Sequence, residues 1–335
     1  MGDKEWRRKI ETFSLDDGDL GSQGYKRVLL QLFGYSGHGK SSFINSCKYV
    51  LNHGGPFREY AQAGQKSDGG SMTMIRKAYD LTHNITIVDN RGFRVMNDFE
   101  RTEVYAQLGN FYPLNKRVEW KENFDEVFSD LLESIWNPNF TDFLVPIFIF
   151  SAKYTFGRQD EENEEDVKGF LENCVKMTGV FPIIVITHKA SRNFQDAERK
   201  FKLMGAEIII AIENYTIENS QKTLDRNIEI LKVIDKALEN VRFRLEQPRD
   251  QMKERKERRN FLLDYFHEAL EKQNREMLNI YFTNLCEVLG KERREREERE
   301  RRVREGRDTG NSDFLNIFQL LGKALREQRS FCTIS

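Results

Sequence analysis

Eight residues, Gly34 to Ser41, match the pattern G-x-x-x-x-G-K-[ST] without a mismatch. Glycines in such a turn let backbone N–H groups converge on phosphate oxygens, which a side chain would keep at a distance. Lys40 would reach the terminal phosphates, and the hydroxyl of Ser41 would bind Mg²⁺. The pattern therefore predicts a phosphate-binding loop. Its candidate contacts are Gly34, Ser36, Gly37, His38, Gly39, Lys40, Ser41 and Ser42.

A second motif, D-x-x-G, begins at Asp89 and ends at Gly92. Asp89 would hold Mg²⁺ through a water molecule, and the amide of Gly92 would sense the terminal phosphate. Between the two motifs, Thr73 is a candidate switch residue that contacts Mg²⁺ only when that phosphate is present. Ser71 competes with it for this role, and an ordinary loop threonine is an equal alternative. The predicted metal ligands are Ser41, Thr73 and Asp89, and the catalytic candidates are Lys40 and Thr73.

Two polar segments further along the chain, Thr187–Ala190 and Glu213–Tyr215, are candidates for contact with a nucleotide base. A guanine-specific loop carries an aspartate where Ala190 stands, and its carboxylate binds the guanine N1–H and N2–H groups. Asp196 replaces that carboxylate only if the loop folds back. The choice between guanine and adenine therefore stays open. The base-side candidates are Thr187, His188, Asn214 and Tyr215.

Apolar runs without alternation precede these motifs. Such runs, rich in Val, Ile and Phe, fit strands that are buried on both faces of a parallel sheet. Because helix-like segments lie between them, we expect an α/β fold with a doubly wound, mainly parallel sheet. The runs are Val28–Phe33, Ile85–Val88, Leu144–Phe150, Ile183–Ile186 and Glu207–Ile212, with a further strand expected at Ile75–Leu81. The helix-like segments are Ser41–Leu51, Glu165–Thr178 and Leu224–Val241.

The C-terminal part of the chain has a helical pattern. Gln251–Leu289 contains no Gly or Pro, and its large apolar residues recur at three- and four-residue spacings, which predicts a packed helical hairpin. Lys291–Glu305 repeats Glu four residues before Arg and lacks an apolar seam, which favours a solvent-exposed helix or spacer. The predicted organisation is a leader (1–26), a nucleotide-binding domain (27–246), a helical region (247–290), a charged helix or spacer (291–310) and an amphipathic helix with the terminal motif (311–335).

The sequence ends on Cys332-Thr333-Ile334-Ser335, which matches C-a-a-X with a terminal Ser and favours farnesylation of Cys332. A single lipid chain binds membranes only weakly and reversibly, so a second membrane signal is expected. The helix expected at 313–325 has one apolar face, which either contacts the membrane or docks on the helical region. Both interpretations stay open, and a nucleotide-controlled switch between them would satisfy both. We expect a cytoplasmic protein that lies peripherally on the cytosolic face of membranes.

The composition excludes several classes of protein. The chain has 335 residues with 53 Lys and Arg against 54 Asp and Glu, a balance that argues against a generally basic nucleic-acid binder. Four widely separated cysteines provide neither a paired zinc motif nor a disulfide framework. Basic and acidic residues are unevenly distributed along the chain, because the part from Gln251 onward carries 19 basic and 16 acidic residues.

With its motifs in this order, the chain resembles the TRAFAC class of P-loop GTPases. More closely, Gly37–Ser46, Glu213–Tyr215 and the segment Leu224–Leu238 are similar to the interferon-induced protein 44 family, and the resemblance covers about residues 27 to 246. It implies a P-loop GTPase fold, GTP or GDP as ligand, Mg²⁺ as cofactor and a link to interferon-dependent innate immunity. The layout of a G domain, helices and a farnesylated tail is similar to that of guanylate-binding proteins. A homodimer through the G domain is a further expectation.

The resemblance has two departures, Ala190 in the base loop and Phe93 after the D-x-x-G motif, where Ras-like enzymes carry a water-orienting Gln. We therefore expect slow hydrolysis of GTP or help from a group elsewhere, with His38, Ser36 and Arg91 as candidates across a dimer. A nucleotide-dependent scaffold without hydrolysis is the main alternative. A P-loop kinase or ATPase acting on a small molecule is a third hypothesis, against which the D-x-x-G motif argues.

Overall fold

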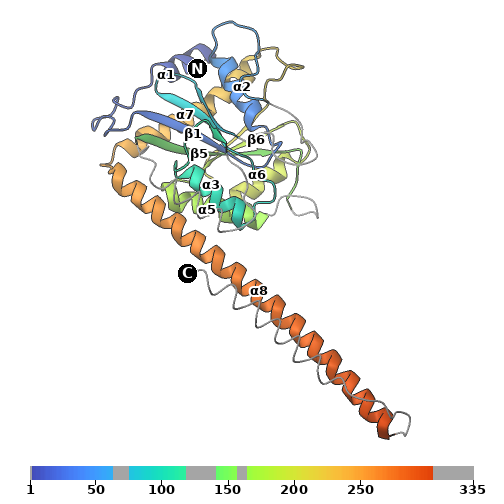
Figure 1. Cartoon of the computed structure of the whole chain (residues 1–335). Coiled ribbons are helices and arrows are strands. Elements are labelled where there is room, and N and C mark those ends of the chain that lie inside the picture. The colour runs from blue at the N-terminus through green and yellow to red at the C-terminus, as the bar shows by residue number, and fades with distance from the viewer. Residues whose placement is uncertain (1, 63–74, 118–140, 157–163, 305–335) are drawn as a thin grey trace. The chain divides into compact units, whose positions relative to one another are not determined.

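A computed structural model of the chain describes residues 2–62, 75–117, 141–156 and 164–304. The chain divides into two compact units, residues 1–270 and 271–335. The first unit contains the sheet and all the sites discussed below (Figure 1). In the second unit the described residues belong to one long helix.

The first unit is built on a seven-stranded, mostly parallel sheet within the described part of the chain, with the order β4-β2-β3-β1-β5-β6-β7. Strand β2 runs antiparallel to its neighbours β3 and β4, and the other pairs are parallel. The strands are β1 (Arg27–Phe33), β2 (Ile75–Asp80), β3 (Ile85–Asp89), β4 (Lys116–Arg117), β5 (Asp142–Ser151), β6 (Ile183–Thr187) and β7 (Ile209–Ile212).

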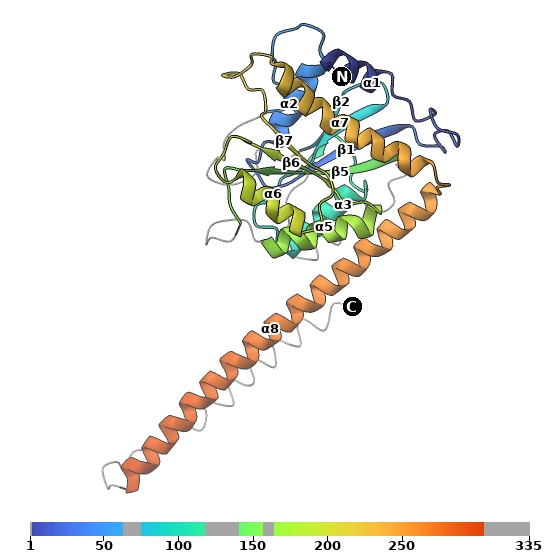
Figure 2. The same cartoon turned by 180° about the vertical axis from the view of Figure 1, so that it is seen from behind.

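Helices cover both faces of this sheet (Figures 1 and 2). One face packs against α1, α2 and α7, and the other against α3, α5, α6 and the first turns of α8. This coverage explains the unbroken apolar runs, because strands β3, β5 and β6 are buried along their whole length. The helices are α1 (Asp3–Glu11), α2 (Lys40–Leu51), α3 (Asp98–Leu108), α5 (Glu164–Thr178), α6 (Phe194–Leu203), α7 (Leu224–Leu245) and α8 (Gln251–Arg304).

The register of the strands places the ends of the central strands at one edge of the sheet. Leu32 of β1 lies opposite Asp89, the last residue of β3. Thr187, the last residue of β6, lies opposite Ser151 of β5 and Ile212 of β7. Ligands of open α/β sheets bind at the carboxyl ends of the strands, so we expect a ligand-binding site at this edge.

The α/β class and the mainly parallel sheet are confirmed, and each predicted strand and helix of the sheet region is present with ends shifted by a few residues. The helical hairpin predicted for Gln251–Leu289 is wrong. A single helix, α8, runs from Gln251 to Arg304 through the charged segment. The physical reason is that no Gly or Pro interrupts this stretch before Gly290, so nothing in it specifies a turn.

The residues before β1 also belong to the first unit. Helix α1 packs on α7, where Lys9 Nζ lies 2.6 Å from Asp235 Oδ1 and Asn227 Nδ2 donates to Asp3 Oδ2 at 3.1 Å. The apolar helix expected at 313–325 and the terminal Cys332 lie outside the described residues. Among the helices that are described, none is long and apolar enough to cross a membrane.

Candidate phosphate-binding site

The G-x-x-x-x-G-K-[ST] segment forms the turn between β1 and α2, as its pattern predicts. Gly34 has φ +133°, and a Cβ there would stand 2.2 Å from the carbonyl oxygen of Ile149, so only glycine fits. Gly39 caps α2 with φ +94°, which also favours glycine. These two glycines allow the backbone to fold tightly over the end of β1. The turn thus has the shape that presents N–H groups and the N-terminus of α2 to an anion.

Lys40 is buried beneath this turn. Its ammonium donates to the carbonyl oxygens of Gly34 at 3.1 Å and Tyr35 at 2.9 Å, so it closes the loop on itself. Burial lowers the pKa of Lys40 to about 8, and the negative charge of Asp89 opposes that shift. A buried ammonium bound only by neutral carbonyls is poorly compensated, so an anion in the loop would stabilise its charge.

Ser41 and Asp89 meet beside the lysine, although they come from different elements. The Ser41 hydroxyl donates to Asp89 Oδ2 at 2.7 Å. Asp89 Oδ1 is buried without a hydrogen-bond partner, and so is Ser36 Oγ in the loop. Burial raises the pKa of Asp89, whereas Lys40 and the hydrogen bond from Ser41 lower it. A carboxylate and a hydroxyl with oxygen lone pairs to spare fit the ligand chemistry of Mg²⁺.

The D-x-x-G motif lies directly on the loop. Phe93 N donates to Gly34 O at 3.1 Å, and Ser36 N donates to Phe93 O at 2.9 Å. A Cβ on Gly92 would stand 2.5 Å from Lys40 Nζ, so glycine is needed for this close approach. The ring of Phe93 is buried against Phe170, with ring centres 5.1 Å apart. The side chain that follows Gly92 therefore packs in the core and offers no polar group to a reaction.

Two residues that the motifs did not reveal hold this second segment in place. Glu100 Oε2 accepts hydrogen bonds from the backbone N–H groups of Arg94, Val95 and Met96, just after Phe93. In return, Asn97 caps α3 by accepting from Glu100 N at 3.0 Å. The spacing N-x-x-E is a capping-box pattern, so the sequence carried a signal that could have identified Glu100.

Arg76 is the second such residue. It lies on β2 and is fully buried, and its guanidinium binds five acceptors. One of them is Asn90 Oδ1, at 3.0 Å from Arg76 Nε, inside the D-x-x-G motif. Arg76 therefore ties that motif to β1 and to the end of α3. The other acceptors are Asn110 Oδ1, Tyr112 O, Gln31 Oε1 and Gln107 O.

The ends of β6 and β7 support the loop from the other side. Thr187 Oγ1 donates to His38 O at 3.1 Å, and Asn214 Nδ2 donates to Gly39 O at 3.3 Å. Asn214 Oδ1 accepts from Ser46 Oγ at 3.3 Å, which connects β7 to α2. These two predicted base-side residues thus hold the backbone of the glycine-rich turn between β1 and α2.

His38 lies at the centre of the loop and is fully buried. Its ring stacks on Tyr154, with ring centres 4.6 Å apart, and its Nδ1 accepts from Ser151 N at 3.3 Å. These contacts fix the ring against the end of β5. The idea that His38 assists catalysis across a dimer therefore receives no support from its position.

The ring of Tyr215 does not lie at the edge of a base pocket, as the sequence suggested, but in the core. Tyr215 is 0% exposed. Its hydroxyl donates to Asn227 Oδ1 at 2.9 Å, and the guanidinium of Arg226 lies 3.9 Å from its ring centre. The pattern of an aromatic residue after a strand does not say which way the ring turns.

The remaining base-side residues are partly exposed. His188, which has φ +56°, places Nδ1 3.5 Å from Glu213 Oε1. Its hydrogen bond lowers the pKa of Glu213, so this carboxyl is charged at neutral pH. Asp196 does not fold back to the position of Ala190: it lies in the first turn of α6 and binds Arg199 at 2.7 Å.

Thr73 and Ser71, the competing switch candidates, lie outside the described residues, as does Cys332. In the described ranges, no cluster of three or more His, Cys, Asp or Glu side chains forms a separate metal site. The structure thus brings together, at one edge of the sheet, the turn of residues 34–39, which we call the glycine loop, and the residues Lys40, Ser41, Asp89, Gly92, Thr187 and Asn214.

A comparison with known protein-family models finds no match for this chain, and a comparison with curated proteins finds no significant one.

Proposed function

We propose that the protein binds GTP with Mg²⁺ at the glycine loop and hydrolyses it slowly. The observation that carries this proposal is the group formed by Lys40, Ser41 and Asp89. A buried ammonium, a hydroxyl and a carboxylate with one unpartnered oxygen meet beneath a turn that only glycines can form. This set of groups matches the needs of a phosphate chain and a hard divalent cation.

In this proposal each residue has a defined task. The N–H groups of the turn and the N-terminus of α2 bind the phosphate oxygens, and Lys40 exchanges its carbonyl partners for the terminal phosphates. Ser41 and Asp89 hold Mg²⁺, which neutralises charge on the phosphates when bound. Gly92, which lies against Lys40 Nζ and Ser36 N, couples the D-x-x-G segment to the terminal phosphate.

The residues around the glycine loop favour slow hydrolysis of GTP. Phe93 and His38 are both buried in aromatic contacts and present no base to an attacking water. The same observation favours the second candidate function, a nucleotide-dependent scaffold without hydrolysis. Single-turnover hydrolysis at rising protein concentration separates the two. Acceleration with concentration supports a GTPase that assembles through its G domain, whereas no turnover at any concentration supports the scaffold.

The preference for guanine depends on the base edge. Guanine offers N1–H and N2–H donors, so a site for it needs a carboxylate or an equivalent acceptor. Ala190 supplies none, but the charged carboxyl of Glu213 follows β7, next to the loop after β6 that contains His188. We therefore assign the base contact to Glu213, with His188 beside it.

In a competition assay against a fluorescent guanine nucleotide, we expect GTP to displace the probe at concentrations at least tenfold below those of ATP. The variant Glu213→Gln should lose most of this preference, because an amide donates where guanine also donates. Glu229→Gln is the matched control, since Glu229 binds Lys189 at 2.5 Å near the same edge. Equal competition by ATP and GTP in the unaltered protein would contradict guanine specificity but not nucleotide binding.

The proposal includes reversible attachment to the cytosolic face of membranes through a farnesyl group on Cys332. The C-a-a-X sequence supports it, together with the expected apolar face at 313–325. By resemblance, the protein would act in interferon-linked innate immunity.

The variant Cys332→Ser should move the protein from the membrane fraction to the soluble fraction of cells, because it removes the thiol that is prenylated. Fractionation followed by detection of the full chain measures this. The control is Cys174→Ser, whose thiol is buried in the first unit. If Cys332→Ser stayed on membranes to the same extent as the unaltered protein, lipid attachment would be refuted while the nucleotide site remained untouched.

A further inference from the structure

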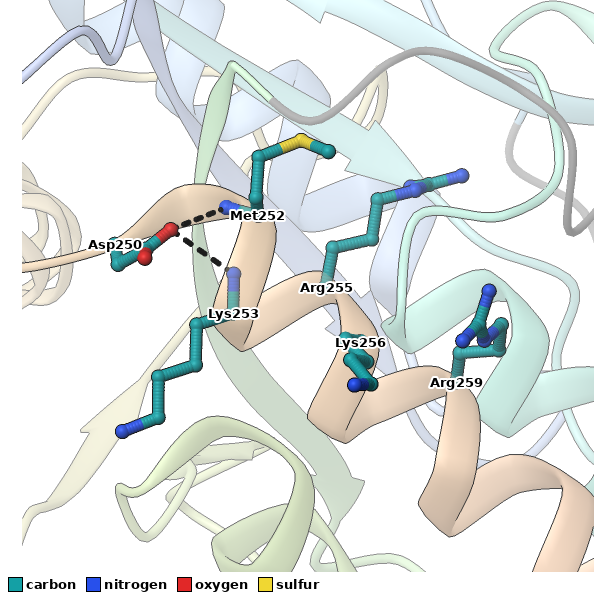
Figure 3. A pocket seen from close by; sticks show the side chains of 6 residues that line it. All are labelled: Asp250, Met252, Lys253, Arg255, Lys256 and Arg259. Carbon is teal, nitrogen blue, oxygen red and sulfur yellow. Dashed lines mark hydrogen bonds between the residues drawn. The ribbon is translucent and has the colours of Figure 1, made fainter.

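Residues at the start of α8 line an open hollow (Figure 3), and none of the described lining residues belongs to the glycine loop. It has a volume of about 520 Å³. Six described residues line it, and four of these are basic: Lys253, Arg255, Lys256 and Arg259. The other two are Asp250 and Met252. We call this hollow with its four basic residues the α8 basic hollow.

The charge of this hollow is not cancelled by neighbours. Several surface cations of the first unit pair with acids, for example Lys200 with Glu164 at 3.2 Å and Lys236 with Glu239 at 2.6 Å. Lys253, Lys256 and Arg259, in contrast, form no ion pair with any described residue. In a chain whose 53 basic and 54 acidic residues otherwise nearly balance, three adjacent unpaired cations make a local positive field.

Of the acids nearby in sequence, Glu254 and Asp250 are already engaged, and the exposed Glu257 is not among the residues that line the hollow. Glu254 binds Arg249 at 2.5 Å, Arg258 at 3.4 Å and the hydroxyl of Tyr25 at 3.0 Å. Asp250 Oδ1 accepts from the backbone N–H groups of Met252 and Lys253, both at 3.0 Å, and these are the bonds drawn in Figure 3. Because Asp250 takes up these amides, the side chains and not the helix end supply the positive charge.

The α8 basic hollow also has a fixed frame. Arg258 is buried and faces the body of the unit, and the guanidinium of Arg255 lies 4.8 Å from the ring centre of the buried Phe111. Burial and the neighbouring Arg258 and Arg259 lower the pKa of Arg255 to about 10, so it stays charged at neutral pH. The first turns of α8 are therefore anchored, and Lys253, Lys256 and Arg259 do not rely on a partner to order them.

We propose that the α8 basic hollow binds the phosphate-bearing headgroups of anionic lipids and so provides the second membrane signal of this protein. Clusters of Lys and Arg attract the negative surface of the cytoplasmic leaflet. Met252, which lines the same hollow, is 62% exposed and offers an apolar side chain beside the cations. Single-stranded nucleic acid stacks its bases on aromatic side chains, and none of the described lining residues is aromatic.

This inference rests on the proposed membrane attachment, because a single farnesyl chain needs a second contact for stable binding. A free polyphosphate shares the chemistry of a lipid headgroup, so the test must distinguish the two sources. The test must also show whether vesicle binding depends on the position of these cations or only on the net charge of the protein.

The experiment uses the full chain with Cys332→Ser, so that no lipid anchor contributes, and measures cosedimentation with vesicles. We expect binding to phosphatidylcholine vesicles containing phosphatidylserine and phosphatidylinositol bisphosphate, but not to pure phosphatidylcholine. Lys253→Glu/Lys256→Glu/Arg259→Glu should weaken that binding at least tenfold. The control Lys26→Glu/Arg192→Glu/Lys232→Glu changes three exposed, unpaired cations and the net charge equally, and should weaken it less than threefold.

Equal losses in both triple variants would overturn the inference, because net charge and not the hollow would then explain the binding. Failure of the parent protein to bind anionic vesicles would overturn it as well. Tight binding of inositol hexakisphosphate or single-stranded RNA without vesicle binding would assign the hollow to those ligands instead. Melting temperature and GTP binding, measured for every variant, report folding and the proposed nucleotide site independently of this outcome.

Discussion

Replacement of Lys40 by alanine is expected to weaken nucleotide binding by about a hundredfold or more. Lys40 is the buried cation of the glycine loop, and its ammonium donates to the carbonyl oxygens of Gly34 and Tyr35 in the loop that we propose binds the phosphates. Loss of a charge-assisted contact to phosphate costs about 2–3 kcal/mol or more, which corresponds to a weakening of roughly a hundredfold. Titration of a fluorescent GTP analogue with Mg²⁺ measures the effect directly.

The fold should survive this change. Lys40→Ala removes two hydrogen bonds but also removes the burden of a buried ammonium, so the two effects on the free energy of unfolding oppose each other. Lys40→Met, which keeps the apolar stem, provides a second variant if alanine leaves a damaging void. Lys48→Ala on the same helix is the matched control, because Lys48 binds the carbonyl of Asp80 far from the loop residues. A folded Lys40→Ala protein with unchanged GTP affinity would disprove the proposed function.

The sheet and the glycine loop could be predicted because their signals are local. An apolar run without alternation fits a buried strand wherever it occurs, and such runs make up most of β1, β3, β5 and β6. The glycines of the loop are required by backbone geometry at their own positions, as the close approach of Gly34 to Ile149 O shows. For these elements, sequence pattern and tertiary structure demand the same residues.

Other parts of the site depend on contacts that no local pattern contains. The sequence of β2, Ile-Arg-Lys-Ala-Tyr-Asp, has no regular alternation and nothing that singles out Arg76 as buried, yet Arg76 is enclosed and donates to the end of α3. The orientation of Tyr215 is decided by Asn227 and Arg226, one turn into α7. The helical pattern of Gln251–Leu289 was recognised, but a periodic pattern alone does not say whether one helix or two will form.

The replacement of Arg76 by methionine is expected to have the largest effect on stability. Five acceptors around the guanidinium would lose their donor in an interior without space for water to take over: Gln31 Oε1, Asn90 Oδ1, Gln107 O, Asn110 Oδ1 and Tyr112 O. Each buried acceptor left unpaired costs about 1–3 kcal/mol, although relaxation recovers part of the sum. We expect a loss of about 4 kcal/mol in the free energy of unfolding, measured by urea denaturation.

Two further variants separate the network from a general effect of substitution. Arg76→Lys keeps a positive charge but has a single nitrogen with three donors, so it should recover only part of the lost stability. Arg58→Met, at an exposed position, should change the free energy of unfolding by less than about 0.5 kcal/mol. A value for Arg76→Met within about 1 kcal/mol of the parent protein would show that the five hydrogen bonds do not hold the segment together.

Replacement of Arg76 should also affect the proposed nucleotide site, because Arg76 acts on that site through its hydrogen bond to Asn90. Asn90 stands between Asp89, a proposed Mg²⁺ ligand, and Gly92, which lies against Lys40. Without the guanidinium, Asn90 loses its link through Arg76 to β1 and α3, although Arg91 N still donates to Gln107 Oε1, so Asp89 and Gly92 are held less firmly relative to the loop. We therefore expect the folded fraction of Arg76→Lys to need more Mg²⁺ for half-maximal GTP binding, whereas Lys40→Ala binds no better at any Mg²⁺ concentration. This contrast distinguishes a residue that positions the metal ligands from one that binds the phosphates.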